Sequence, residues 1–374
     1  MGWWNEFVVK GGFTRPKNLS LYALGVYGDS GRNGSALLVA IFCFTIIHLA
    51  WKKEVLQKQA LGSILPRKVR AVWSLPARAV WIWNQAKAGV PQKFLVASVL
   101  SDPTSFFDWA GSRNINQVWI DVWPVLSDPT KLGDLKKFCH SAKESGVLVN
   151  FLALAAPGFA VKENHLAANQ QLGQIYDLID KIDADDRPVG IQADIEPHTL
   201  TSVKKYTDDS FAVGLLWPGK APQILSEFLD LVTQLRETSV TRNATLGQYV
   251  NLCFAVPRFF LDAKATDTIA DGSSQLVGND ILACGVDVAV MDYLPPGSNL
   301  AKISANNWAN AAGEFGQLAW IGFESNPDDP PNNYAGQGAF LEKDIQAFSS
   351  SLQDAIGFAT MAVDDANGYV EIMP

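Results

Sequence analysis

Two carboxylates stand two residues apart in the stretch "GIQADIEPH", residues 190–198. If this stretch is a strand, Asp194 and Glu196 lie on one face of it and at its carboxyl end. Paired acids in such a position suit acid/base chemistry, in which one carboxyl donates a proton and the other orients or stabilises the reacting group. A solvated loop is the competing interpretation, and the surrounding elements decide between the two.

Acidic and aromatic residues also end several other predicted strands. Burying carboxylates costs several kcal/mol unless they are paired or hydrated, so a cluster of them favours a functional site. Flat tryptophan faces suit the apolar face of a sugar ring, although packing inside the protein explains any single tryptophan equally well. We predict Glu196, Asp194 and Glu324 as catalytic residues. The predicted substrate-binding residues are Asp121, Trp123, Asp292, Tyr293, Trp320 and Asp364.

The elements that would position these residues follow one alternating pattern. Eight short apolar runs, rich in β-branched and aromatic residues, read as strands buried on both faces. They occupy residues 93–100, 116–123, 147–154, 189–196, 250–257, 286–293, 317–325 and 357–363. Amphipathic stretches between them read as helices, for example residues 128–146, which begin with Asp-Pro and end with Gly.

This alternation predicts an α/β fold, a (β/α)8 TIM barrel spanning residues 93–374. A doubly wound open sheet is the alternative, but no glycine-rich nucleotide loop follows the first predicted strand. The last strand leaves little chain for an eighth outer helix. We therefore expect residues 70–90 to cover that flank.

The sequence before residue 93 has a different composition. Residues 36–51, "ALLVAIFCFTIIHLAW", are almost wholly apolar and predict a single transmembrane helix after a leader of residues 1–35. Residues 52–93 carry nine basic side chains and one acidic one, which suits anionic lipid headgroups. We expect the basic segment 52–92 to act as a linker, with residues 66–85 lying at the membrane interface.

The charge distribution bears on topology and partners. More Lys and Arg follow the predicted span than precede it, which places the barrel on the cytoplasmic, matrix or stromal side. The remaining residues, 94–374, hold 17 basic and 35 acidic side chains, which argues against a nucleic-acid partner. The expected partners are the lipid bilayer, a glycan, and possible other subunits of a membrane complex bound through residues 1–60.

Two short motifs resemble those of glycosidase families. "GIQADIE" is similar to the strand-four signature of family 18 chitinases, Asp-x-x-Asp-x-Asp-x-Glu, and "VMDY" is similar to their strand-six segment. The resemblance implies that Glu196 protonates the leaving oxygen, while Asp194 orients the acetamido group of the substrate. Val189 and Gln192 stand where that family has acids.

"IEPH" followed by "IGFES" resembles a second group, the retaining clan with one glutamate after strand four and one after strand seven. That resemblance implies Glu196 as acid/base, Glu324 as nucleophile and Tyr293 as its hydrogen-bond partner, although Ile195 replaces the usual Asn. The Glu196 and Glu324 carboxyls should then be about 5 Å apart. His198 could hydrogen bond at the cleft, but a role in stabilising the loop is favoured.

Histidine and cysteine spacing predicts neither a metal site nor a cofactor, and the cysteines are expected to be free thiols. Two functions therefore stay open. One is a membrane-anchored, glycoside-hydrolase-like barrel that acts on or binds a glycan. The other is an inactive barrel that serves as an accessory subunit of a membrane protein complex.

Overall fold

The computed structural model describes residues 78–84, 93–200, 221–261, 276–325, 333–352, 355, 357–364 and 366–372. The chain divides into two units, residues 1–61 and 62–374, and all described residues belong to the second. The predicted leader and the predicted transmembrane helix, residues 36–51, lie outside the described residues. Within the described ranges, none of the helices combines the length and the apolar character needed to cross a membrane.

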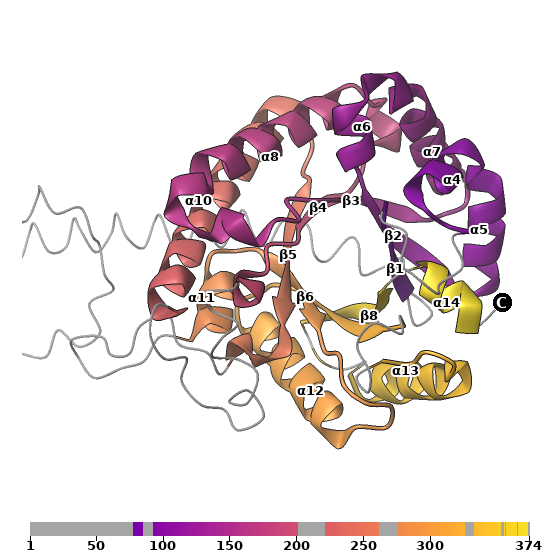
Figure 1. Ribbon diagram of the computed structural model, residues 1–374, viewed down its shortest axis with the longest axis vertical. Helices are drawn as coiled ribbons and strands as arrows, with labels where there is room; N and C mark the ends of the chain where they lie inside the picture. Colours follow the sequence, from indigo (N-terminus) through magenta and orange to yellow (C-terminus); the bar gives the residue numbers. More distant parts are fainter. Residues whose placement is uncertain are drawn as a thin grey trace, which may run out of the picture. The chain divides into compact units, whose positions relative to one another are not determined.

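Eight parallel strands close into a barrel in sequence order, β1 to β8, as predicted (Figure 1). The strands are β1 Arg78–Ile82, β2 Ile115–Asp121, β3 Leu148–Ala153, β4 Gly190–Ala193, β5 Asn251–Pro257, β6 Asp287–Met291, β7 Ala319–Glu324 and β8 Phe358–Asp364. The barrel closes where β1 pairs with β8, with Val80 opposite Val363.

Helices surround this barrel in a ring (Figure 1). They are α4 Val96–Ser101, α5 Pro103–Ser112, α6 Trp123–Ser127, α7 Leu132–Glu144, α8 His165–Asp180, α10 Ala221–Leu246, α11 Val277–Ala283, α12 Asn299–Glu314, α13 Gly338–Leu352 and α14 Ala366–Ile372. Short 3-10 turns link them at η2 Pro129–Lys131, η3 Pro157–Ala160, η4 Lys162–Asn164, η5 Ala184–Asp186, η6 Pro197–Thr199 and η8 Arg258–Leu261.

The predicted helix after β2 forms as expected. Asp128 accepts a hydrogen bond from the backbone N–H of Thr130 at the start of η2. The helix α7 then runs to Glu144, and Gly146 follows with φ of 69°, a left-handed conformation that favours glycine.

The first predicted strand is wrong. Residues 96–101 form the helix α4, whose buried residues Val96, Val99 and Leu100 recur at helical spacing. A short, continuous apolar run fits a strand and a buried helix equally well, which explains the error. The first strand is instead β1, so the barrel begins at Arg78 and not at residue 93.

This correction also removes residues 78–82 from the predicted membrane-interface segment. Arg78 is 8% exposed, and its guanidinium binds the Glu342 carboxylate of α13 at 2.9 and 2.7 Å. It also donates to the Tyr369 hydroxyl of α14 at 2.8 Å. The arginine therefore ties β1 to two helices. The helix α14 contacts both β1 and β8 at this flank. Of residues 70–90, which we predicted to cover it, residues 78–82 form the strand β1 itself, and residues 70–77 and 85–90 lie outside the described residues.

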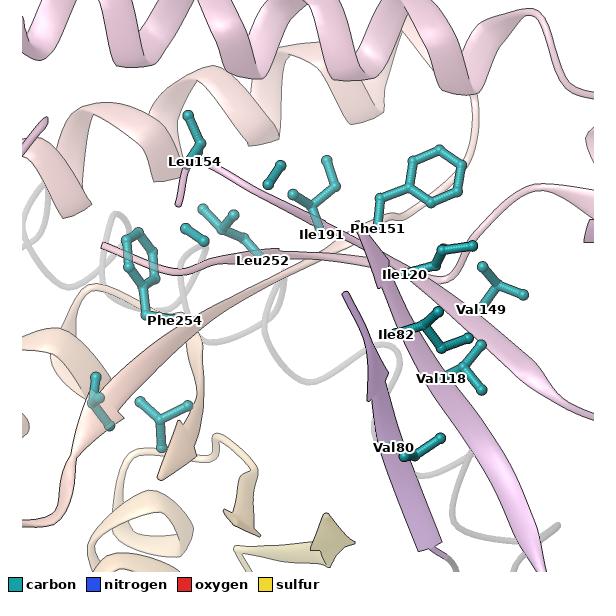
Figure 2. Packing of buried hydrophobic residues seen from close by; sticks show 14 of the residues in the cluster. Val80, Ile82, Val118, Ile120, Val149, Phe151, Leu154, Ile191, Leu252 and Phe254 are labelled. Carbon is teal, nitrogen blue, oxygen red and sulfur yellow. The ribbon is translucent and has the colours of Figure 1, made fainter. Parts of the chain in front are cut away.

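Two apolar layers follow from the alternation of side chains along each strand. The outer layer packs strands against helices, and Figure 2 shows Phe151 and Ile191 of neighbouring strands within it. Burying one such side chain contributes about 1.5–3 kcal/mol. The inner layer fills the barrel and comprises Ala79, Trp81, Trp119, Leu152, Cys253, Ala289, Trp320 and Ala362.

Candidate active site at the carboxyl ends of the strands

Three tryptophans form the floor of the candidate site. The rings of Trp81 and Trp119 stack with centroids 4.7 Å apart, and Trp320 meets Trp119 edge to face at 5.8 Å. The Trp81 indole N–H donates to the Gln192 side-chain oxygen at 2.9 Å, and that of Trp320 donates to Gln117 at 3.3 Å. Because these rings fill the middle of the barrel, chemistry is left to the mouth above them.

Side-chain alternation decides which acids reach the mouth. Trp119 faces the interior, so Asp121, two residues later, faces it as well, and the same holds for Trp320 and Glu324. Asp364 continues the inward face of Ala362 within β8, and Asp194 and Glu196 lie just beyond the carboxyl end of β4. Glu324 and Asp364 are direct partners in the β7–β8 register, and each is 6% exposed.

Electrostatics confirm that several of these acids are neighbours. Burial raises the pKa of Asp194 well above its ordinary value, and the charges of Glu196, Asp364 and Asp121 raise it further. Burial likewise raises the pKa of Tyr293, which feels the charges of Asp364, Glu324, Asp194 and Glu196. The structure therefore brings Asp121, Asp194, Glu196, Tyr293, Glu324 and Asp364 together, and we call these six residues the mouth cluster.

Glu196 has the electrostatics of a proton donor. Burial raises its pKa to about 7, and the charge of Asp364 contributes to the increase. A carboxyl with this pKa is protonated in about half of the molecules at neutral pH, which suits general acid catalysis. Its separation from Glu324, which we expect to be about 5 Å in a retaining clan-type site, stays a prediction.

His198 lies next to Glu196 but does not carry the charge that an ion pair needs. Its Nε2 atom is 3.9 Å from Glu196 Oε1, while burial lowers the histidine pKa to about 4. The imidazole is therefore neutral at pH 7. Its ring packs edge to face on Phe259 and Phe260, at centroid distances of 5.5 and 6.1 Å, which agrees with a role in holding the loop.

Asp292 does not join the mouth cluster. It is 2% exposed and lies just after β6, and the next residue, Tyr293, is the one that lies near the acids of the mouth. Burial raises the pKa of Asp292 to about 7, while Ser304 on α12 and the positive charge of Arg258 oppose the increase. Of the predicted substrate-binding residues, Asp292 is thus the one that faces the outer helices.

The two tryptophans predicted to bind substrate lie at different depths. Trp123 is 54% exposed, and its backbone N–H donates to the Asp121 carboxylate at 2.9 Å. Trp320 lies in the floor and is 7% exposed. Trp123 is therefore the more accessible flat surface at the edge of the mouth.

Residues of β1 are the ones that the sequence interpretation missed. Trp83, just after β1, donates its indole N–H to Asp364 at 2.8 Å, and the Asn84 backbone donates to Asp121. The alternation of Ala79, Trp81 and Trp83 could have revealed this strand, but we assigned the segment that contains them to a membrane surface. Within the described residues, no group of three or more His, Cys, Asp or Glu side chains is arranged to hold a metal ion.

Comparisons with known proteins assign no family to this chain. No protein-family model matches the sequence, and no curated protein matches it. Many solved structures share the barrel. The chitinase ICChI from Ipomoea carnea is 12% identical, with a TM-score of 0.43 over 79% of this chain and 95% of the other.

Two further structures illustrate the range of these similarities. The 3-keto-D-glucoside 4-epimerase YcjR from E. coli is 12% identical, with a TM-score of 0.42 over 78% of this chain and 97% of its own. A family 18 N-acetylglucosaminidase from Paenibacillus barengoltzii is 12% identical, with a TM-score of 0.39 over 67% and 68% of the two chains. The chain's own strand topology makes it a TIM barrel, and these structures are only distantly similar to it.

Proposed function

We propose that this barrel is a glycoside hydrolase that uses Glu196 as its general acid. The observation that carries the proposal is the position and pKa of this one carboxyl. It stands at the carboxyl end of β4, where TIM barrels place their chemistry, and burial beside Asp364 raises its pKa to about 7. The exposed ring of Trp123 offers a surface on which a sugar can stack.

A change of leaving group tests this role directly. The full chain is assayed on a panel of nitrophenyl glucosides, galactosides, mannosides and N-acetylglucosaminides, together with the matching dinitrophenyl glycosides. A nitrophenolate needs protonation more than a dinitrophenolate does. Glu196→Gln should therefore lower kcat/KM for the nitrophenyl series by about a hundredfold or more and kcat/KM for the dinitrophenyl series far less.

The exposed residue Glu163 provides the matched control, because Glu163→Gln removes a carboxylate outside the mouth. Equal losses on both leaving groups, or no loss at all, would exclude Glu196 as the acid. The panel also separates the two resemblances. Turnover restricted to N-acetylglucosaminides would favour a chitinase-like mechanism that uses the substrate's acetamido group.

The alternative proposal is an inactive barrel that serves as an accessory subunit of a membrane complex. The observation that favours it concerns Gln192, which stands where family 18 chitinases have an acid. Its side-chain oxygen accepts a hydrogen bond from the Trp81 indole N–H. In this case the wild-type chain hydrolyses no member of the panel. Pull-down with a chain lacking residues 1–60 should then lose the partners that the full chain retains.

Membrane attachment is a separate proposal, which rests on the apolar run of residues 36–51. The full chain should stay in the membrane fraction after an alkaline carbonate wash, and a chain lacking residues 1–60 should not. Release of the full chain by the wash would rule out a membrane span.

A further inference from the structure

The carboxylate that works together with Glu196 can be identified from the hydrogen bonds and strand register of the mouth. Two candidates stand side by side at the ends of β7 and β8, Glu324 and Asp364, which are register partners. Both are 6% exposed and both face the interior. Their surroundings distinguish them.

Asp364 is held in place from the neighbouring strand. Trp83 donates its indole N–H to Asp364 Oδ1 at 2.8 Å, and β1 pairs with β8 directly below this bond. The backbone carbonyl of Asp364 also accepts a hydrogen bond from the Ser325 hydroxyl. A carboxylate fixed through both its side chain and its backbone is preorganised to meet a reacting atom.

Asp364 also lies among the residues that the reaction needs. Its charge acts on Glu196, Asp194 and Tyr293, and of these three residues the charge of Glu324 acts on Tyr293. The strands β4 and β8 lie on opposite sides of the barrel, so their inward side chains approach each other near its axis.

We propose that Asp364, held by Trp83, is the nucleophile of the glycosidase, and that Glu324 is not. This inference rests on the proposed function. In the first step the Asp364 carboxylate bonds to the anomeric carbon, the glycosidic C–O bond breaks, and the Glu196 proton moves to the leaving oxygen. In the second step water attacks the anomeric carbon, gives its proton to Glu196, and the bond to Asp364 breaks, which restores both carboxyls.

Covalent trapping in the full-length wild-type chain is the first test, because it depends on no substitution. Dinitrophenyl glycosides with fluorine at the sugar's second carbon, in the configurations that the panel shows to be substrates, should form a stable glycosyl ester. Mass spectrometry of the digested chain should find the ester on the peptide that contains Asp364. A label on Glu324, or hydrolysis with inverted stereochemistry, would overturn the assignment.

Substitutions give an independent test on the dinitrophenyl substrates, which bypass the need for an acid. Asp364→Ala should lower turnover on the order of a thousandfold, and Glu324→Gln by far less. Sodium azide should restore turnover of Asp364→Ala and yield a glycosyl azide of inverted configuration. If Asp364→Ala fails to fold, Asp364→Asn and the trapping experiment still decide the question.

Trp83 is a positioning residue in this scheme, since it acts through Asp364. Trp83→Phe removes the indole donor while keeping an aromatic ring. It should lower kcat about tenfold or more and leave KM within about twofold, because the ground-state contacts with the sugar remain. A change confined to KM would argue against the role.

The failure of this inference is distinguishable from failure of the proposed function. A wild-type chain that hydrolyses glycosides while Asp364→Ala retains full activity would overturn the nucleophile and leave the hydrolase in place. A wild-type chain that is inactive on the whole panel and takes up no label would overturn both.

Discussion

Replacing Glu196 by Gln should stabilise the folded barrel at alkaline pH while lowering its proposed activity on nitrophenyl glycosides. The burial that raises the pKa of this carboxyl to about 7, from an ordinary 4.5, disfavours its ionised form in the folded state. Glutamine has the same shape and no charge to bury. A gain in stability on removing a catalytic group is the expected sign of a site optimised for chemistry and not for folding.

The magnitude follows from the difference between the two pKa values. Since each pKa unit corresponds to about 1.4 kcal/mol, the ionised carboxylate is disfavoured by ~3 kcal/mol in the folded state. The Glu196 side chain is 29% exposed, so solvent screens part of this penalty. We therefore expect Glu196→Gln to raise the free energy of unfolding by about 2 kcal/mol at about pH 8.

The pH dependence provides the decisive feature. A group whose pKa is raised by folding contributes stability that is fully present below its unfolded pKa and is lost as pH rises through the folded pKa. For Glu196 this window runs from 4.5 to about 7. The advantage of the Gln variant should therefore nearly vanish at the acid end of this window and grow toward neutral and alkaline pH.

Urea unfolding at three pH values across and above this window measures the effect. Glu163→Gln, an exposed substitution, serves as the control and should change stability by less than about 0.5 kcal/mol at every pH. A Glu196→Gln variant that is less stable than the wild type at alkaline pH would refute the reasoning. So would a gain in stability of equal size at both ends of the window.

Three shorter predictions concern the barrel itself. A chain lacking residues 1–60 should keep one cooperative thermal transition. A chain lacking residues 1–92 should lose that transition, because it lacks β1. The same thermal transition in both chains would contradict the assignment of β1. Glu342→Ala should lower the free energy of unfolding by ~3 kcal/mol, because it removes the carboxylate that pairs with the buried guanidinium of Arg78; a loss below about 1 kcal/mol in urea would contradict this. Gln192→Leu should cost about 1–3 kcal/mol by leaving the indole N–H of Trp81 without its acceptor, and unchanged urea stability would argue against that hydrogen bond.

Hydrophobic patterning predicted the barrel because strands buried on both faces differ plainly from amphipathic helices. It failed at the start of the barrel, where two apolar runs, residues 78–83 and residues 93–100, both fit the pattern of a first strand. Residues 66–85, with three tryptophans and three arginines, resembled a membrane surface, although Ala79, Trp81 and Trp83 alternate as in a strand. The partner that neutralises Arg78 is Glu342, 264 residues away, and no local pattern shows such a contact.

The mouth cluster was largely predictable for a different reason. In a parallel barrel all strands end at the same side, so acids that end separate strands must meet there. What the sequence could not show is which polar side chains are already engaged within the barrel. Gln192 and Gln117 reach indoles on distant strands, and Trp83 reaches Asp364 across 281 residues.

Strand β6 shows why a raised pKa does not by itself mark a functional site. Burial raises the pKa of Asp287, at the amino end of this strand, to about 6. Yet its carboxylate accepts hydrogen bonds from the Leu318 backbone N–H at 2.7 Å and from Asn251 at 2.5 Å. It therefore joins β6 to the chain on either side of it at the amino end of the barrel, away from the mouth.

Two further polar residues with different surroundings follow the carboxyl end of the same strand. Asp292 turns outward toward α12, whereas Tyr293 turns inward and meets the charges of four acids of the mouth cluster. The three residues differ in which end of the barrel they occupy and in which side of the sheet they face. Burial raises the pKa of Glu196, Asp287 and Asp292 alike. Of these three, Glu196 is the one that lies at the mouth of the barrel. The proposed chemistry is therefore assigned to the mouth cluster alone.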